Sequence, residues 1–321
     1  MLDEPPGRTA YVQGKKHLFF SGYGYLGVQH VPEFKVLVKE GIDKYGWLHP
    51  SSRISNTRLA LYEECEQLLS SITGSESTVL VSSGFTAGTL AVGKWAGGIT
   101  NLQPSHPAIH TANPQQPTGI YAVDSVNVLT SSITNINNLT PVDATTLVID
   151  DSHGIGIIGV NGNGVSGCID KRLGVDYVFA FSLSKALGII AGAVSCSKQL
   201  ADEYRAMPAY TASTAPSPAM LYAFLKGQHI YADQRGKLRG NIAYFRQLVQ
   251  GLHGINNHPA LPVFVLDNGI DENVSLNKNI IISSFAYPDP NGKKIQRVVL
   301  NALHTKSDLE HLAEVLTEIK K

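Results

Sequence analysis

Short apolar runs that end in small, hydroxyl-bearing or charged residues recur along the chain and predict buried β-strands. These runs lie at residues 78–81, 120–126, 146–150, 177–181 and 192–196. Segments with apolar residues at helical spacing lie between them. The alternation of strand-like and helix-like segments predicts an α/β fold with a mainly parallel sheet flanked by helices.

The predicted helices have recognisable ends. Residues 31–45 carry apolar side chains at helical spacing, and Gly46 after them is a usual C-terminal signal. Gly74 ends the amphipathic segment 59–72 in the same way. Further helices are expected at residues 198–207, 218–232 and 235–252.

The C-terminal part has its own pattern of strands followed by a helix. Strands are expected near residues 261–266, 279–285 and 295–300. A helix should follow from about residue 308, and Ser307 and Glu310 have capping-box spacing for its start. This order predicts a small C-terminal α/β domain.

The composition restricts the classes of function. A chain of 321 residues, 43% of them hydrophobic, can bury one large core and a smaller one, so one or two domains are expected. The formal net charge of zero argues against nucleic acid or an anionic membrane as the main partner. No apolar run approaches membrane-spanning length, and the N-terminus lacks the charged-then-apolar layout of a secretory signal.

The cysteines indicate a reducing compartment. Cys65, Cys168 and Cys196 are an odd number without metal-ligand spacing, so neither a disulfide framework nor a metal site is expected. A cytoplasmic protein fits these observations.

Lys185 is the first candidate for chemistry. It follows the apolar run 177–181; Ser182 and Ser184 precede it, and Gly188 comes after it. A lysine in this place is poorly explained as a solvated surface charge. It is either a Schiff-base nucleophile or a loop lysine just past a core strand.

A second strand end favours the chemical reading of this lysine. The run 146–150 ends in Asp150, and His153 and several glycines follow it. If both strands are parallel, their carboxyl ends gather Asp150, His153 and Lys185 at one crevice. Asp151, beside Asp150, is interpreted as a loop carboxylate.

A lysine paired with a carboxylate suits one cofactor, pyridoxal 5'-phosphate. The lysine forms an imine with the cofactor, and the carboxylate keeps the pyridine nitrogen protonated so that the ring accepts electrons. Ser182 is placed to meet the phosphate. A helix start at residues 82–88, which contains Gly84, offers further backbone N–H groups for that phosphate.

Four motifs together resemble the α-oxoamine synthases, a family of fold-type I pyridoxal-phosphate enzymes. These motifs are the run DDSHGIGIIG from Asp150, the run SLSKALG around Lys185, the helix start Ser83-Gly-Phe-Thr86, and the tail QRVVLNALHTKSDLEHLAEVL. The similarity extends from about Tyr25 to the end of the chain.

The resemblance implies a fold, a domain division and an assembly. We expect the PLP-dependent transferase fold type I, with an N-terminal arm and helix (1–45), a large PLP-binding domain (46–233) and a small C-terminal domain (234–321). Active sites of this fold form between two subunits, so a homodimer is expected.

The resemblance also assigns roles around the cofactor. Lys185 would hold it, Asp150 would partner the pyridine nitrogen, and His153 would contact the phenolic oxygen. His106 would stack on the ring, with His110 as the alternative. The remaining expected contacts are Ser83, Gly84, Phe85, Thr86, Asp124, Ser182 and Ser184.

Other matching residues are expected at the substrate and at the subunit boundary. Ser213 and Thr214 match hydroxyls that reach the partner's phosphate, or else they cap the helix that follows. Arg297 matches an arginine that holds the amino-acid carboxylate; a strand-edge arginine without a ligand is the alternative. Tyr25, in a Tyr-Leu-Gly arm motif, and Arg53, in a loop near the neighbouring subunit's site, are candidate substrate contacts.

The sequence departs from the family in several places. Tyr23 and Gly24 stand where polar residues are usual in the family. Asp124 keeps the acid of another family pattern, but the residues after it do not follow that pattern. The connection after His106 is shorter than in the family. The implied reaction condenses a small amino acid with an acyl-coenzyme A, with loss of carbon dioxide, to an aminoketone. The alternatives are another fold-type I enzyme, an aminotransferase or lyase, or a cofactor-binding protein without turnover.

Overall fold

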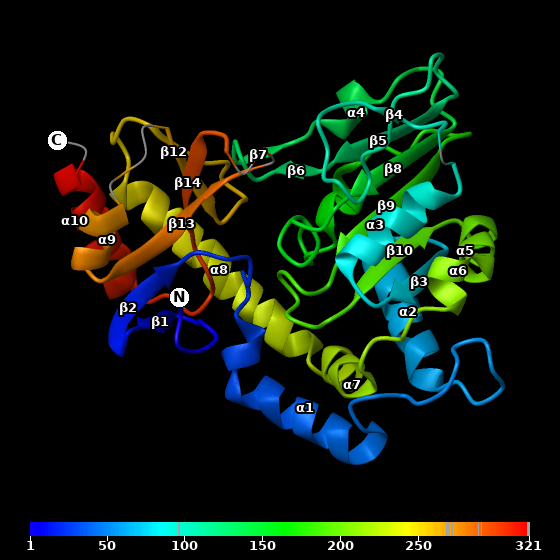
Figure 1. The fold of residues 1–321 in the computed structure, drawn as a ribbon, viewed down its shortest axis with the longest axis horizontal. Helices are drawn as coiled ribbons and strands as arrows, with labels where there is room; N and C mark the ends of the chain where they lie inside the picture. Colours follow the sequence, from blue (N-terminus) through cyan, green and yellow to red (C-terminus); the bar gives the residue numbers. More distant parts are fainter. Residues whose placement is uncertain (96, 268–269, 271, 288, 290, 320–321) are drawn as a thin grey trace. The chain divides into compact units, whose positions relative to one another are not determined.

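The computed structural model describes residues 1–95, 97–267, 270, 272–287, 289 and 291–319. Two compact units make up the chain (Figure 1). One comprises residues 31–126 and 134–230, and is called the large unit here; the other comprises residues 1–30, 127–133 and 231–321, and is called the small unit. The predicted division at residues 45 and 233 stays a prediction.

A six-stranded sheet forms the centre of the large unit. Its order is β3 (Ser77–Val81), β10 (Gly192–Cys196), β9 (Asp176–Ser182), β8 (Thr146–Asp150), β5 (Ile120–Asp124) and β4 (Thr100–Asn101). β4, β5, β8 and β9 pair in parallel, whereas β10 runs antiparallel to both of its neighbours. The predicted α/β fold with a mainly parallel sheet is confirmed.

Helices α3 (Gly84–Gly93) and α5 (Lys198–Ala206) supply apolar side chains to the core of this sheet. Leu90 and Ala91 of α3 are fully buried with Val178 of β9 and Val194 of β10, and Tyr204 of α5 joins the same cluster. Burying a side chain of this kind contributes about 1.5–3 kcal/mol. Figure 1 shows α3 lying across the sheet.

Glycines at helix ends behave as predicted. α1 (Pro32–Tyr45) ends at Gly46, and α2 (Ala60–Thr73) ends at Gly74, whose φ of 60° is left-handed. α1 packs along α7 (Pro218–Lys226). A Cβ on Gly41 of α1 would come within 2.6 Å of the Ala219 carbonyl oxygen, so the two helix backbones are too close at this point for any residue larger than glycine.

The boundary predicted between the helices at 218–232 and 235–252 is wrong. α7 ends at Lys226, and α8 (Gln228–Leu248) begins two residues later. Gly227 separates them, and its N–H donates to the Ala223 carbonyl oxygen as a helix C-cap. Gly236 and Gly240 inside α8 have open space around them and do not break it.

The small unit contains a second six-stranded sheet. Its order is β1 (Thr9–Val12), β2 (Lys15–Phe20), β13 (Ile280–Ala286), β14 (Lys294–Val299), β12 (Val263–Leu266) and β11 (Ile255–Asn256). β2 and β13 are parallel, and the other pairs are antiparallel. The N-terminal arm thus joins the C-terminal strands in one sheet.

The last helix, α10 (Lys306–Ile319), begins earlier than predicted. Its capping box is Thr305 with Asp308, not Ser307 with Glu310: the Thr305 N–H donates to Asp308 Oδ2 at 2.7 Å, and the Asp308 N–H donates to Thr305 Oγ1 at 3.3 Å. Arg8 makes a further ion pair with Asp308 at 2.6 Å, which favours this register.

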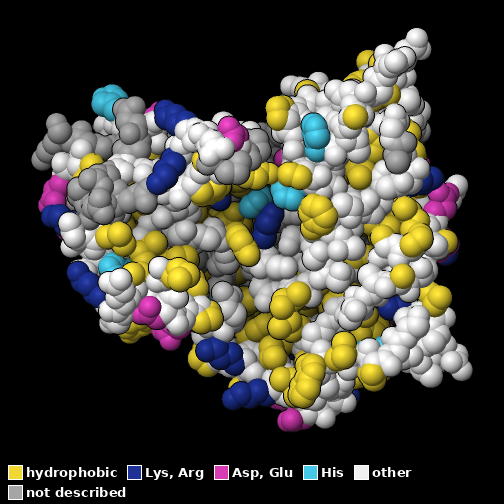
Figure 2. Space-filling model, in the orientation of Figure 1, with side chains coloured by type: hydrophobic (Ala, Val, Ile, Leu, Met, Phe, Trp, Pro, Cys, Tyr) yellow, Lys and Arg dark blue, Asp and Glu magenta, His cyan; other side chains and the backbone are white. Residues whose placement is uncertain are grey.

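Short elements complete the described chain: η1 (Val28–His30), β6 (Val126–Asn127), β7 (Ser132–Ile133), α4 (Ile136–Leu139), η2 (Gly164–Cys168), α6 (Pro208–Thr211) and α9 (Glu272–Asn277). Figure 2 shows basic and acidic side chains interspersed on the face in view, in keeping with the net charge of zero. Among the helices described, none has the length and apolar character needed to cross a membrane.

Candidate active site

The carboxyl ends of β8 and β9 bring the predicted lysine and histidine together. Asp150 ends β8 and pairs in parallel register with Ala180 of β9. His153 lies three residues beyond Asp150, and its Nε2 is 3.0 Å from Lys185 Nζ. Because both turns leave the same edge of the sheet, a carboxylate, an imidazole and an amine occupy one place in the large unit.

Hydrogen bonds between the two strand ends fix this arrangement. The Ser152 N–H donates to Asp150 Oδ1 at 2.9 Å, and the Ser182 N–H donates to Ser152 Oγ at 3.0 Å. The Ser184 N–H donates to Ser182 Oγ at 3.2 Å. The Ser152 hydroxyl therefore holds the two turns together, whereas the Ser182 hydroxyl accepts a hydrogen bond within its own turn. Ser152, the link between them, was not predicted.

The loop after β4 brings His106 to the same place. His106 Nδ1 lies 3.9 Å from Asp150 Oδ2, whereas the alternative ring, His110, is exposed. Burial lowers the pKa of His106; the Asp150 charge raises this pKa and the Lys185 charge lowers it. The lowered pKa favours a neutral imidazole at pH 7.

Asp124, at the end of β5, fixes the backbone of His106. The His106 N–H donates to both Asp124 oxygens, at 2.9 and 3.2 Å. Burial raises the pKa of Asp124 to about 7; the nearby Asp150 charge raises it further, while the His106 N–H and the Lys185 charge oppose the shift. Two carboxyl groups and one amine thus share a partly buried site. Shifts in pKa of this kind are typical of active sites.

The start of α3 provides an anion-binding geometry. Ser83 is its N-cap, and Ser83 Oγ accepts from the Thr86 N–H at 3.1 Å. The remaining N–H groups of the first turn have no acceptor within the helix. A Cβ on Gly84 would lie 2.4 Å from Ser182 Cβ, so the helix start touches the end of β9. Only glycine permits this approach.

Together these residues fit a phosphorylated aldehyde cofactor. The helix start and the Ser182 hydroxyl suit a phosphate, Lys185 suits an aldehyde, and Asp150 suits a protonated ring nitrogen. Phe85 is exposed at the helix start, with 58% of its surface accessible. No group of metal-ligating side chains is found among the described residues.

Ser213 and Thr214 do not cap the helix that follows. α7 has Ser217 at its N-cap position, so that alternative is wrong. Ser213 Oγ donates to the Tyr210 carbonyl oxygen at 3.4 Å, and Thr214 is exposed. Their expected place at a partner's phosphate stays a prediction.

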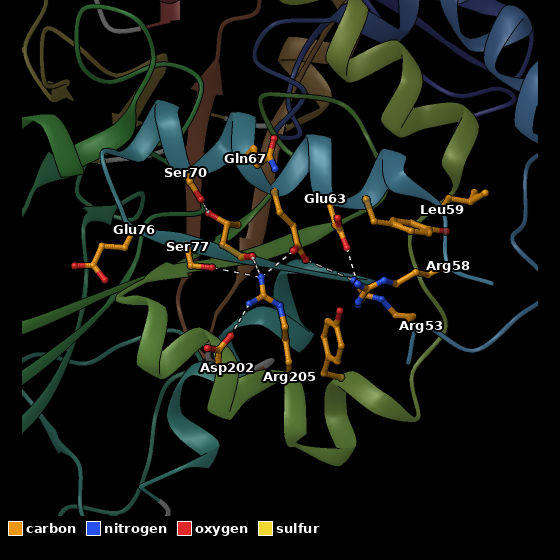
Figure 3. A pocket seen from close by; sticks show the side chains of 14 residues that line it. Arg53, Arg58, Leu59, Glu63, Gln67, Ser70, Glu76, Ser77, Asp202 and Arg205 are labelled. Carbon is orange, nitrogen blue, oxygen red and sulfur yellow. Dashed lines mark hydrogen bonds and ion pairs between the residues drawn. The ribbon is translucent and has the colours of Figure 1, made fainter. Parts of the chain in front are cut away.

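Arg53 is buried, although the loop that carries it is polar and irregular. It lines a cavity of about 530 Å³ beside β3, together with Glu66, Arg205 and Tyr210 (Figure 3). Only 4% of Arg53 is exposed, and its guanidinium carbon lies 4.0 Å from the centroid of the Tyr210 ring. Burial lowers the pKa of Arg53.

The charged side chains that line this cavity cover the free edge of the sheet at β3. Glu66 accepts from the Leu80 N–H at 2.9 Å, and Arg53 donates to the Leu80 carbonyl oxygen at 2.5 Å. Arg205 donates to the Thr78 carbonyl oxygen at 2.8 Å and pairs with Glu66 at 2.9 Å. Buried charges thus satisfy the unpaired groups of edge strand β3. A substrate contact by Arg53 stays a prediction.

Tyr25 and Arg297 lie together in the small unit. Tyr25 is 2% exposed, and burial raises its pKa to about 12, against the lowering effect of the Arg297 charge. Arg297 Nη1 donates to the Val128 carbonyl oxygen at 3.2 Å, and its guanidinium lies 5.0 Å over the Phe285 ring. Arg297 Nε is buried without a hydrogen-bond partner among the described residues, so it retains a donor for a ligand.

Comparison with known proteins agrees with this geometry. Residues 88–316 match the family aminotransferase class I and II. An 8-amino-7-oxononanoate synthase of Coprothermobacter proteolyticus is 26% identical over 370 aligned positions, which cover 100% of this chain and 92% of the relative. The alignment is longer than this chain, so the relative carries additional segments.

Two solved structures share the fold. A serine palmitoyltransferase of Sphingomonas wittichii superposes with a TM-score of 0.84 at 18% identity, covering 99% of this chain and 91% of that one. An 8-amino-7-oxononanoate synthase of Francisella tularensis gives 0.71 at 20% identity, covering 94% and 97%. The resemblance to α-oxoamine synthases and the fold type I of PLP-dependent enzymes are confirmed. The chain belongs to the aminotransferase class I and II family.

Proposed function

We propose that this protein is a PLP-dependent acyltransferase that condenses a small amino acid with an acyl-coenzyme A, with loss of carbon dioxide, to an aminoketone. The observation that carries the proposal is the cluster of Lys185, His153, Asp150 and His106 beside a glycine-opened helix start. Relatives aligned over the whole chain are named 8-amino-7-oxononanoate synthases, and a solved serine palmitoyltransferase of the same fold contains PLP.

The cofactor, when bound, would draw electrons from the amino-acid α-carbon into its ring. Lys185 would hold its aldehyde carbon until the amino group of the substrate displaces it, and the freed lysine amine would then act as the base that removes the α-proton. Asp150 would hold a proton at the ring nitrogen. His153 would donate a hydrogen bond at the phenolic oxygen, and neutral His106 would cover one face of the ring.

The phosphate would be held by backbone and hydroxyl groups. Gly84 and Phe85 would present N–H groups of the first turn of α3, Thr86 lies in the same turn with its own N–H bonded to Ser83, and Ser182 would add a hydroxyl. Ser213 and Thr214 would contribute from the partner of a homodimer. The exposure of Thr214 in the single chain supports this role.

The substrate would be recognised by buried groups of the small unit. Arg297 offers an unpaired Nε donor to a carboxylate, and Tyr25 lies beside it. Arg53 would shape the neighbouring subunit's site through its loop. The relative carries segments that this chain lacks, and such segments could line an acyl pocket. The accepted acyl length is therefore measured by assaying acyl-coenzyme A donors of different lengths.

The proposal is tested with purified protein loaded with PLP. Glycine, alanine or serine is added with acyl-coenzyme A, and released coenzyme A is detected with a thiol reagent. Lys185→Ala is the matched control, because it keeps the exposed Cys168, which also reacts with such reagents. We expect coenzyme A release from the wild type and a loss of roughly 10²–10⁴-fold in Lys185→Ala.

Other outcomes would redirect the assignment. Amino-group transfer to an oxo acid, without coenzyme A release, would identify an aminotransferase; the changed Tyr23-Gly24 arm favours testing this alternative. A visible band that no amino acid disturbs would indicate a cofactor-binding protein without turnover. Failure of the wild type to bind PLP would overturn the proposal.

A further inference from the structure

Asp151 follows Asp150 but faces the interior of the protein. Only 1% of it is exposed. The Ser125 hydroxyl donates to Asp151 Oδ1 at 2.6 Å, and the Val165 N–H donates to Asp151 Oδ2 at 3.0 Å. The two oxygens therefore connect the end of β8 to two segments that are distant in the sequence.

The backbone of the following turn is folded around this carboxyl group. A Cβ on Gly154 would lie 2.0 Å from Asp151 Oδ1, and a Cβ on Gly164 would lie 1.8 Å from Oδ2. The main-chain oxygen of Asp151 accepts from the N–H groups of Gly154 and Ile155, each at 3.0 Å. Both arms of the turn at residues 151–165 thus contact one side chain.

His153 lies inside this turn. Its ring reaches Lys185 at 3.0 Å, so a shift of the turn would alter that distance directly. We propose that Asp151 is a positioning residue, whose contacts with Ser125 and Val165 hold the turn in the place where His153 meets Lys185. The inference rests on the proposed function, because it assigns His153 and Lys185 to the cofactor.

Two substitutions separate contact from charge. In Asp151→Asn, the amide oxygen can accept from the Val165 N–H, and the amide nitrogen can donate to Ser125 Oγ, so both contacts survive without the charge. Asp151→Ala removes both. Ser125→Ala removes one contact and leaves the carboxyl group in place. Asp176→Asn, at an exposed aspartate in the same unit, is the matched control.

The first readout is the pH midpoint of the visible absorbance change of bound PLP, because that absorbance reports the protonation of groups at Lys185. We expect Asp151→Ala to shift the midpoint by about one pH unit, the size of one hydrogen bond to a charged group. Its kcat should fall about tenfold while KM stays within about twofold. Asp151→Asn and Asp176→Asn should stay within about 0.3 units of the wild type, and Ser125→Ala should shift in the direction of Asp151→Ala.

The second readout needs no cofactor. Hydrogen exchange of the backbone amides at residues 152–158 is measured in the PLP-free protein at pH 4, where Asp151 is uncharged in the folded state, and should be at least about tenfold faster in Asp151→Ala and unchanged in Asp151→Asn. Wild-type midpoint and exchange in Asp151→Ala, or an Asp151→Asn protein as impaired as Asp151→Ala, would overturn the proposal. If Asp151→Ala does not fold, an unshifted Ser125→Ala would overturn it. Absence of PLP binding by the wild type would refute the proposed function and leave the exchange comparison valid.

Discussion

Replacing Asp151 by asparagine should make the PLP-free protein more stable at pH 8 and leave its stability nearly unchanged at pH 4. Burial raises the pKa of Asp151 to about 7, and the neighbouring Asp150 charge adds to the shift, against the opposing contacts from Ser125 and Val165. Between pH 3.8 and about 7 the folded protein binds the proton that the unfolded chain has released, so stability falls as pH rises through this range.

The size of the effect follows from the shift. Each pKa unit corresponds to 1.36 kcal/mol, so a rise of about three units destabilises the folded protein by about 4 kcal/mol above pH 7. Asparagine keeps the two hydrogen bonds and has no charge to bury. Asp151→Asn should therefore gain about 4 kcal/mol over the wild type at pH 8 and almost nothing at pH 4.

The assay is thermal unfolding of both proteins across this pH range. For a chain of this size, about 4 kcal/mol corresponds to a difference of roughly 5–10 °C in melting temperature at pH 8. The difference between the two proteins isolates Asp151, because Asp124, whose pKa is raised in the same direction, is present in both. Asp176→Asn should follow the wild type. A difference that is equal at pH 4 and pH 8, or larger at pH 4, would refute the reasoning.

Three further predictions concern other parts of the molecule. Gly84→Ala should weaken PLP binding by roughly 10–100-fold, because the new methyl would lie 2.9 Å from Ser182 Cα at the start of the phosphate-binding helix. Titration of the visible absorbance measures this. Gly93→Ala, whose new methyl meets only the end of the Met207 side chain, should bind normally. Glu66→Ala should destabilise the large unit by about 3–5 kcal/mol, because Arg53 and Arg205 would lose their buried partner; equal denaturant curves for this variant and the wild type would contradict it. His304, stacked on Phe20, has its pKa lowered to about 4 by burial, so the unfolded chain binds the extra proton and stability falls by about 3 kcal/mol as pH drops from 6.5 to 4. His304→Gln should lack this acid-dependent loss, and an undiminished loss in thermal unfolding would rule out His304 as its source.

Local signals in the sequence determined much of the fold and part of the candidate site. Continuous apolar runs identified β8 and β9, and the glycines after α1 and α2 marked their ends. These features depend on side chains within a few positions of one another. The parallel arrangement of strand ends then placed Asp150 and Lys185 at one edge, as predicted.

Tertiary structure decided what depends on segments that are distant in the sequence. The contact of Asp151 with Ser125 spans 26 positions, and that of Arg205 with Glu66 spans 139. No periodicity reports such pairs, because burial of a charge depends on which strand edge or turn folds over it. The sequence also does not show which histidine of one irregular loop lies beside Asp150; in the structure His106 lies there, and His110 is exposed. Local sequence patterns therefore specify the chemistry available at the strand ends, whereas tertiary packing selects which charges are buried and which side chains meet.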